Sequence, residues 1–523
     1  MTGGRETGRR RPSVLLVQAD QFRWDCLGAA GHPDVSTPHL DQLAADGVRY
    51  TEAFCPLPVC TPSRYSLLTG LYPHQHGGWT NHCTLPPATW TFPRALRQAG
   101  YRTAAVGKMH FTPAYLDVGY ARMTLAEQHG PGRWEDDYHR ELREAGLAPV
   151  ADLTDQEEWA RASAPAAYWR DFGAGRSDLP EEWHSTTWIA ERALAELERW
   201  DEAGGNLLHV SFIKPHHPFD PPAPWDERYD PAALTVLPGW TDAIPPADLP
   251  HQRHAYFPYE TLTEAALRRV MAGYYATITQ LDHHVGRMLR LLRERGLYQD
   301  TLVVFTSDHG EYLGFHHLLL KNGPMYDPLV RVPLLVKYPA GRGPGTGPSG
   351  DLVSLTDVAP TIASVCGVPS PAWLPGLDLT GPGPARDVVF AENRTFGRHE
   401  LMARSRTHKL LLYGDVPADG SGHEAPDALF DLVADPHELD NRLADPAGAE
   451  AAARLRSALA RWAMFDTPVP TYLDEEAPRV DAPNVPPPVP ARRAAHRAYF
   501  QAAVARSVAA TAVQRREPEE PPA

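Results

Sequence analysis

The 523-residue chain lacks the features that mark several large classes of protein. No apolar run comes near the roughly 18 residues that a membrane-spanning helix needs, so we expect no membrane partner. Basic residues are in deficit, because 50 Lys and Arg stand against 65 Asp and Glu and leave a formal net charge of −15. Nucleic-acid affinity depends on Lys and Arg neutralising phosphates, so this balance excludes a general nucleic-acid binder.

Cysteine is scarce as well. The chain holds five cysteines, an odd number without any C-x-x-C spacing. This pattern argues against both a disulfide framework and a zinc finger. Residues 1–11 are basic and Gly-rich and lead directly into the apolar run 14–18, without the longer apolar region of a secretory signal. Together these observations predict a cytoplasmic location.

Lysine is the rarest charged residue, with five lysines among the 50 basic residues. A compact ammonium and a planar guanidinium differ chemically, so a site that needs a point charge keeps lysine. Each lysine is therefore a candidate functional residue: Lys108, Lys214, Lys321, Lys337 and Lys409.

What is present predicts a globular α/β protein. Hydrophobic residues make up 43% of the chain and charged residues 22%, close to the average of folded proteins. Short β-branched or Leu-rich runs alternate with helical patterns, which is typical of a mostly parallel sheet sandwiched by helices. The expected strands are residues 14–18, 103–106, 207–212, 302–305 and 333–336.

Polar residues follow the first four of these strands. Ligands of open α/β sheets collect beyond the carboxyl ends of the strands. We therefore expect four side chains to converge there: Asp20, Lys108, His216 and Asp308. Helices are expected from Thr37-Pro38 onwards, over residues 63–69 after Pro62, and over residues 272–295.

The chain divides into three predicted regions. Residues 12–375 form the α/β domain, with an insertion at about 112–180. Residues 376–475 form a small α+β domain, with antiparallel strands at 388–391, 401–403 and 409–413. Residues 476–523 form a Pro-rich linker and a helical tail, through which we expect a homo-oligomer to assemble.

The segment Cys60-Thr61-Pro62-Ser63-Arg64 is the most informative part of the sequence. Cys60 is expected at the N-terminus of a helix, where free N–H groups and the helix dipole favour anionic oxygen. Arg64 follows four residues later, on the same face. The pair can hold a tetrahedral oxyanion. The alternative is that Cys60 is an ordinary small buried residue and Arg64 a surface charge.

This C-x-P-S-R segment, followed by Thr69-Gly70, resembles the sulfatase family, whose members oxidise this cysteine to Cα-formylglycine. The resemblance extends in family order over roughly residues 13–340, with a weaker match at 429–436, and it implies an alkaline-phosphatase-like fold. Its further motifs are Thr37-Pro38-His39-Leu40-Asp41, Gly107-Lys108-Met109-His110, Pro215-His216-His217-Pro218, Ser307-Asp308-His309-Gly310 and Lys321.

A metal site is expected at two strand ends. Asp20 and Gln21 end one strand while Asp308 and His309 follow another, which supplies hard oxygen atoms and one imidazole to a divalent cation. The resemblance implies that residue 60 is also a ligand. Many sulfatases have Asp at the position of Gln21 and Asn at that of His309. The Gln and His pair is similar to choline-sulfatase-type and phosphonate-monoesterase-type members, and it predicts Ca²⁺, with Mn²⁺ as the alternative.

The resemblance also implies roles for the remaining residues. Lys108 and His110 point the same way if the chain is extended, and in sulfatases the matching pair binds the formylglycine hydroxyls. His216, with His217 as the alternative, is the general acid for the leaving alcohol. Lys321 would bind a sulfate oxygen. Asn81 either contacts the anion or is an ordinary loop residue.

The sequence therefore predicts a sulfuric ester hydrolase that cleaves a small-molecule sulfate monoester and depends on a formylglycine-generating enzyme for maturation. A phosphonate monoester or phosphodiester hydrolase on the same scaffold is the close alternative, although Gly107-Lys108-Met109-His110 favours sulfate. A third hypothesis is a non-catalytic anion-binding protein in which Cys60 stays a thiol. The sequence does not identify the natural alcohol.

Overall fold

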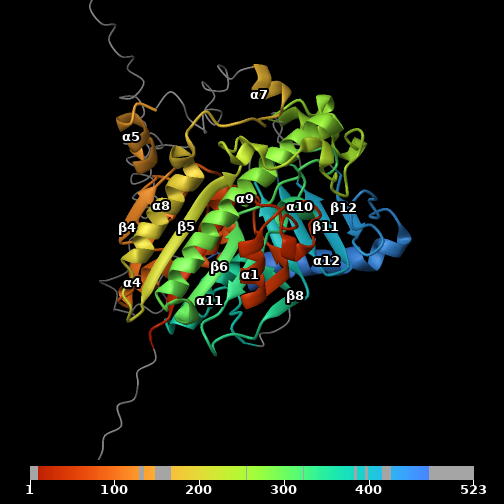
Figure 1. Cartoon of the computed structure of the whole chain (residues 1–523). Helices are drawn as coiled ribbons and strands as arrows, with labels where there is room; N and C mark the ends of the chain where they lie inside the picture. The colour runs from red at the N-terminus through yellow and green to blue at the C-terminus, as the bar shows by residue number, and fades with distance from the viewer. Residues whose placement is uncertain are drawn as a thin grey trace, which may run out of the picture.

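Two β-sheets organise the protein (Figure 1). The computed structural model describes residues 10–128, 135–147, 166–254, 256–321, 323–381, 386–394, 399–414 and 426–469. The large sheet has eight strands in the order β4-β3-β5-β1-β6-β7-β2-β8, and the small sheet has four in the order β12-β11-β10-β9. A mixed, mostly parallel sheet with flanking helices and a separate antiparallel sheet confirms the predicted fold class.

The strands of the large sheet are β1 (Ser13–Asp20), β2 (Val48–Phe54), β3 (Arg102–Gly107), β4 (Arg122–Leu125), β5 (Asn206–Pro215), β6 (Thr301–Ser307), β7 (Leu334–Lys337) and β8 (Gly347–Ser354). The central strands β1, β5 and β6 are buried along their whole length. This burial on both faces explains their continuous hydrophobic runs. Strand β7 runs antiparallel to both of its neighbours, β6 and β2.

All five predicted strands lie in this sheet, whereas β2, β4 and β8 were not predicted. Strand β4 lies within the predicted insertion at 112–180 and pairs in parallel with β3 at the sheet edge. It has only four residues, of which one is fully buried, so it carries no hydrophobic run that the sequence could reveal. Strand β8 begins with the largely exposed residues 347–351, so these residues form no hydrophobic run that would indicate a strand.

Helices cover the sheet. Helices α8 (Ser185–Glu198) and α9 (Glu264–Glu294) pack against β5 and against each other (Figure 1). Helices α2 (Cys60–Thr69), α4 (Phe92–Gln98) and α11 (Val358–Cys366) pack together as a second group. The other helices are α1 (Pro38–Asp46), α3 (Pro73–His76), α5 (Asp137–Glu144), α7 (Ala166–Arg170), α10 (Asp327–Val330) and α12 (Ala449–Arg461).

Helix α9 begins eight residues before the predicted start at residue 272. Its N-terminus is set by Thr263, whose hydroxyl accepts a hydrogen bond from the Ala266 N–H at 3.2 Å. The N–H groups of the first turn have no partner within the helix, and a capping threonine accepts a hydrogen bond from one of them. The helix therefore extends back to this threonine. Gly296 follows the C-terminus of α9 with a φ of 64°.

The small sheet contains β9 (Val389–Asn393), β10 (Glu400–Arg404), β11 (His408–Tyr413) and β12 (Ala428–Asp431), all antiparallel. The three strands predicted there are present, and β12 is an addition. The main hydrophobic core continues from the large sheet to residues of β9 and β10. The predicted domain boundaries stay predictions. The region 476–523, with its helical tail and oligomer contact, lies outside the described residues.

Within the described ranges, the helices are all too short or too polar to cross a membrane.

Candidate active site

The carboxyl ends of four neighbouring strands meet at one edge of the large sheet. In the order β3, β5, β1 and β6, these strands lead to Lys108, His216, Asp20 and Asp308. The Lys108 ammonium lies 2.7 Å from Asp20 Oδ2. Three of these side chains are almost entirely buried, and His216 is 4% exposed. The predicted convergence is therefore present in the structure.

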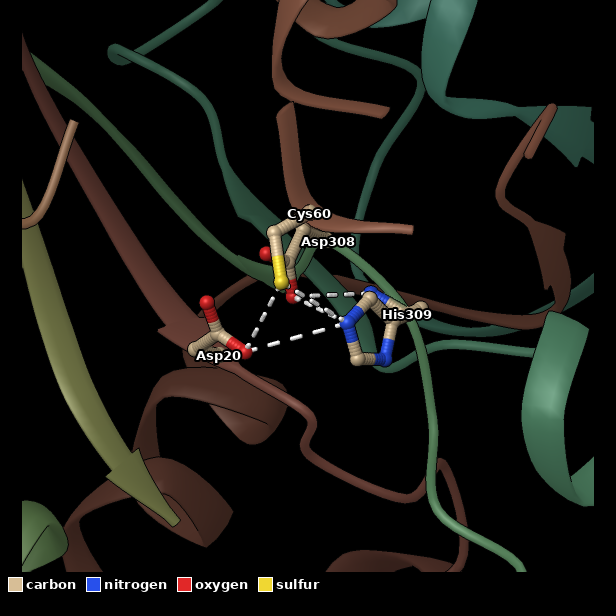
Figure 2. A group of neighbouring side chains, drawn as sticks. All are labelled: Asp20, Cys60, Asp308 and His309. Carbon is tan, nitrogen blue, oxygen red and sulfur yellow. Dashed lines mark hydrogen bonds and ion pairs between the residues drawn. The ribbon is translucent and has the colours of Figure 1, made fainter. Parts of the chain in front are cut away.

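Four side chains at this edge form a group that can hold a metal ion (Figure 2). The ligand atoms of Asp20, Cys60, Asp308 and His309 all lie within 4.8 Å of one another. His309 donates its Nδ1 proton to the Gly310 carbonyl at 2.9 Å, which leaves the Nε2 lone pair facing the group. Burial lowers the pKa of His309 and keeps the imidazole neutral, as ligation requires.

Gln21 contacts this group through its backbone. Its backbone has a φ of 64°, and its N–H donates to Asp308 Oδ1 at 3.1 Å. The side-chain Nε2 donates to Glu311, while Oε1 is buried and has no hydrogen-bond partner among the described residues. A buried oxygen without a partner, on a residue whose backbone N–H contacts Asp308, fits a ligand of a hard divalent cation. This donor set is compatible with both Ca²⁺ and Mn²⁺.

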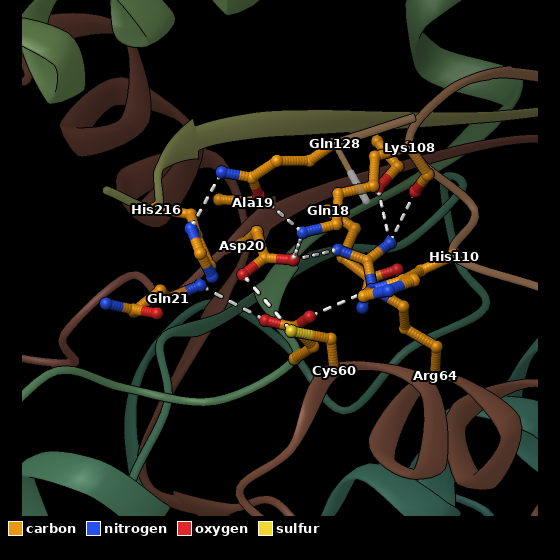
Figure 3. A network of polar contacts seen from close by, with 12 residues as sticks. Gln18, Ala19, Asp20, Gln21, Cys60, Arg64, Lys108, His110, Gln128 and His216 are labelled. Carbon is orange, nitrogen blue, oxygen red and sulfur yellow. Dashed lines mark hydrogen bonds and ion pairs between the residues drawn. The ribbon is translucent and has the colours of Figure 1, made fainter. Parts of the chain in front are cut away.

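Helix α2 presents Cys60 and Arg64 to the site, and every residue of this helix is buried. The Arg64 guanidinium donates to Asp308 Oδ2 and to Asp20 Oδ2, each at 2.9 Å (Figure 3). It also donates to the Lys108 carbonyl at 2.5 Å and to Ser211 Oγ at 2.7 Å. The alternative in which Arg64 is a surface charge is therefore wrong. Its fork holds the two carboxylates of the metal group in place.

Lys321 brings a second cation to Cys60. Its Nζ lies 2.8 Å from Cys60 Sγ, 3.1 Å from His216 Nε2 and 3.2 Å from His309 Nε2. Burial opposes its charge, but the neighbouring Cys60 and Asp20 raise the pKa of Lys321 above its ordinary value. Burial also opposes ionisation of Asp20, yet the adjacent cations hold the pKa of Asp20 well below its usual range. Both groups stay charged.

His216 is the histidine that joins this group. Its Nδ1 donates to the His217 carbonyl at 2.7 Å, so Nε2 faces Lys321. Burial, followed by the charges of Lys321 and Lys108, lowers the pKa of His216 well below its ordinary value. The His217 ring stacks on His216 with centroids 4.5 Å apart and contacts Tyr256. These contacts favour His216 over His217.

His110 and Asn81 lie at the helix α2 end of the site. His110 has a φ of 55°, so the segment is not extended there and the expectation that it points the same way as Lys108 loses its basis. Its carbonyl accepts from the Thr61 hydroxyl at 2.7 Å. Asn81 Oδ1 accepts from the Thr61 N–H at 3.0 Å. Asn81 thus accepts a hydrogen bond from an N–H of the first helical turn. This use of its oxygen favours the alternative that Asn81 is an ordinary loop residue.

The site also contains residues that the sequence patterns did not predict. Gln128 accepts from Lys108 Nζ at 2.8 Å and donates to the His217 carbonyl at 2.7 Å. Glu127 accepts from the Met109 and His110 N–H groups at 3.0 Å. Both follow the unpredicted strand β4, so no sequence signal pointed to them. Glu311 did have a signal, because it lies three residues after Asp308.

Comparisons with known proteins agree with this geometry. The sulfatase family model matches residues 12–368. An arylsulfatase of Clostridium perfringens is 28% identical over 82% of this chain and 90% of its own length. The multifunctional alkaline phosphatase superfamily protein PehA of Trinickia caryophylli is 31% identical over 84% of this chain and 92% of its own.

Among solved structures, a phosphonate monoester hydrolase of Agrobacterium radiobacter superposes with a TM-score of 0.71 at 25% identity, covering 87% of this chain and 96% of that one. The family model covers well over half of the chain. The chain therefore belongs to the sulfatase family.

Proposed function

We propose that the protein is a sulfuric ester hydrolase that cleaves a small-molecule sulfate monoester into sulfate and an alcohol. The observation that carries this proposal is the group of cations around residue 60. Among the described residues, Arg64 and Lys108 form ion pairs with Asp20 and Asp308, while Lys321 Nζ lies 2.8 Å from Cys60 Sγ. A tetrahedral anion bound beside Cys60 would compensate the charge of Lys321.

Residue 60 is the proposed nucleophile. Cys60 is the first residue of α2 and is 1% exposed. Maturation to Cα-formylglycine would give a hydrated aldehyde whose hydroxyl attacks sulfur. Because the whole of α2 is buried, the formylglycine-generating enzyme must act on Cys60 before the chain folds.

The proposed metal ligands are Asp20, Gln21, residue 60, Asp308 and His309. A divalent cation bound there, Ca²⁺ first and Mn²⁺ second, would polarise the sulfate and favour the ionised nucleophile. Arg64 holds the two carboxylates in the position that this cation requires.

His216 is the proposed general acid. Its Nε2 lies 3.1 Å from Lys321 Nζ, so the two groups face the same anion. Burial and the neighbouring cations lower the pKa of His216 and make its protonated form a strong acid, and the proton passes from Nε2 to the leaving alkoxide. Lys108 and Lys321 stabilise the anionic oxygens. His110 would then accept the proton of the second hydroxyl at residue 60 as sulfate leaves.

A phosphonate monoester or phosphodiester hydrolase is the second candidate. The name of the Agrobacterium radiobacter structure favours it, and these substrates carry one negative charge, as a sulfate monoester does. The charge of the site therefore suits both. The arylsulfatase relative and the Lys108 and His110 pair support sulfate.

The test combines two measurements on protein from a host that contains the maturation enzyme. The mass of the tryptic peptide that holds residue 60 should show the aldehyde. The kcat/KM for 4-nitrophenyl sulfate should then exceed the kcat/KM for phenylphosphonate and phosphodiester substrates. A phosphonate preference selects the second candidate, and an unmodified thiol without activity selects the anion-binding hypothesis. The cytoplasmic location stays a prediction.

A further inference from the structure

Glu311 is a buried carboxylate that joins two parts of the site without touching Cys60 in any contact described. It is 0% exposed and lies two residues after His309. Its Oε2 accepts from Gln21 Nε2, and its Oε1 accepts from the N–H groups of Leu313, at 3.0 Å, and Leu320. A single carboxylate thus binds the neighbour of Asp20 on one side and a loop on the other.

The first contact sets the orientation of the Gln21 amide. A primary amide has one donor end and one acceptor end, and both side-chain oxygens of Glu311 accept hydrogen bonds. Nε2 must therefore face Glu311, and Oε1 must point elsewhere. The Gln21 backbone cannot rotate to change this, because its N–H is held by Asp308 and its carbonyl accepts from the Tyr274 hydroxyl at 2.7 Å. The buried, orphaned Oε1 is the result.

The second contact closes the loop that carries Lys321. Four non-glycine residues of this loop have positive φ angles, a conformation that costs free energy and persists only when the surroundings impose it. They are Leu313, His316, His317 and Leu320, with φ between 46° and 66°. Glu311 accepts from the N–H groups of the first and the last of them, directly before Lys321.

We propose that Glu311 is a positioning residue of the divalent-metal site: it turns the Gln21 amide oxygen toward the cation and anchors the loop that delivers Lys321. The inference rests on the proposed function only in that the cation is the one that the hydrolase would use. Glu311 acts through Gln21 and Lys321 and has no direct part in the chemistry.

The test exchanges the polarity of the Gln21 and Glu311 pair. In Glu311→Gln, one oxygen remains for the loop, but the new Nε2 opposes the Nε2 of Gln21, so the Gln21 amide must flip and present its NH₂ to the cation. We expect the dissociation constant for Ca²⁺ or Mn²⁺, measured by calorimetry without substrate, to rise at least about 10-fold, as for other groups that orient metal ligands. Gln21→Glu alone, which opposes two carboxylates, should also bind the metal more weakly than the wild type.

The double variant Gln21→Glu, Glu311→Gln restores a donor facing an acceptor and leaves one oxygen of residue 21 for the cation. Its metal affinity should recover to within about threefold of the wild type or exceed it, since coupled pairs deviate strongly from additivity. Glu392→Gln is the matched control. Glu392 is also a buried carboxylate that accepts from a backbone N–H and a side chain, both of His74, but it lies in the small sheet.

Wild-type affinity in Glu311→Gln, or a double variant that binds no better than Glu311→Gln, would overturn the proposal. So would a loss of affinity in Glu392→Gln equal to that of Glu311→Gln, or a melting temperature of Glu311→Gln that falls equally with metal and with chelator, because either result indicates general damage to the fold. The readout is metal binding, so a failure of sulfate hydrolysis would refute the proposed function and leave this result standing.

Discussion

Two clusters of charged side chains in this protein have different roles. The active-site cluster consists of Asp20, Arg64, Lys108, Asp308 and Lys321. The junction cluster lies where the small sheet meets the large one and consists of Glu52, Asp327, Arg331, Arg404, Lys409 and Glu438. Both are shielded from water, and both rely on short ion pairs.

The difference lies in charge balance. In the junction cluster three cations meet three carboxylates: Lys409, for example, lies 2.6 Å from Asp327 and 2.7 Å from Glu438. In the active-site cluster Arg64 and Lys108 pair with Asp20 and Asp308, and Lys321 adds a third cation beside Cys60, before any metal adds its charge. A balanced buried cluster is satisfied by folding alone, whereas an unbalanced one needs a ligand anion. The imbalance is what distinguishes a binding site from a structural joint.

We expect the largest loss of activity when the nucleophile of the active-site cluster is replaced. In Cys60→Ala the charges and the fold remain, but no atom is left to attack sulfur, so kcat/KM for an aryl sulfate should fall by more than about 10⁴-fold. Cys366→Ala, which removes another buried cysteine on α11, should keep the activity. Retained turnover in Cys60→Ala would exclude residue 60 as the nucleophile.

The lysines of the two clusters, Lys321 and Lys409, test the comparison directly. Lys321→Met should lower kcat about 10²- to 10³-fold with little loss of stability, because it removes a charge from the cationic excess. Lys409→Met should leave kcat per folded molecule unchanged but reduce the free energy of unfolding by about 3 to 5 kcal/mol, since it leaves Asp327 and Glu438 without their shared cation. Steady-state kinetics and urea denaturation of both variants provide the check. Similar phenotypes in the two would contradict it.

Substitutions of Gln128 test how the active-site cluster aligns His216. Gln128 connects Lys108 to the His217 carbonyl, which in turn fixes His216 Nδ1. Gln128→Ala should reduce kcat about 10-fold through loss of this alignment. Gln128→Glu would place a negative charge near His216 and raise its pKa, so the alkaline limb of the kcat profile should move to higher pH. An unshifted limb in Gln128→Glu would argue against His216 as the general acid.

The smallest expected effect concerns pH and stability. Burial, followed by nearby Asp136, raises the pKa of Glu127 to about 7, and burial raises that of Asp282 to about 7 as well. Between the unfolded value, near 4.5 or below, and pH 7 the folded state binds more protons than the unfolded state. Stability should therefore decline as pH rises through this window. In Glu127→Gln or Asp282→Asn the decline of the melting temperature, measured from pH 5 to pH 8, should become shallower by a few degrees. A slope equal to that of the wild type would disprove the assignment.

Sequence patterns predicted the site better than the sheet edges. Strands β1, β5 and β6 were visible because burial on both faces demands unbroken apolar runs. Strand β4 was invisible because an edge strand of four residues needs no such run. Since Glu127 and Gln128 follow β4, their contacts with the Lys108 segment could not be inferred either.

The sequence by itself determined the chemistry: the order of strand ends, the Cys60 to Arg64 helix start and the types of metal-ligating residues are local features that short motifs encode. Tertiary structure alone decided how these groups are used. It committed the Arg64 guanidinium to two carboxylates, placed His216 Nε2 against Lys321, and turned the oxygen of Gln21 away from Glu311. Hydrogen-bond orientation and charge balance depend on partners that lie far apart in the chain, and only the folded sheet brings them within reach.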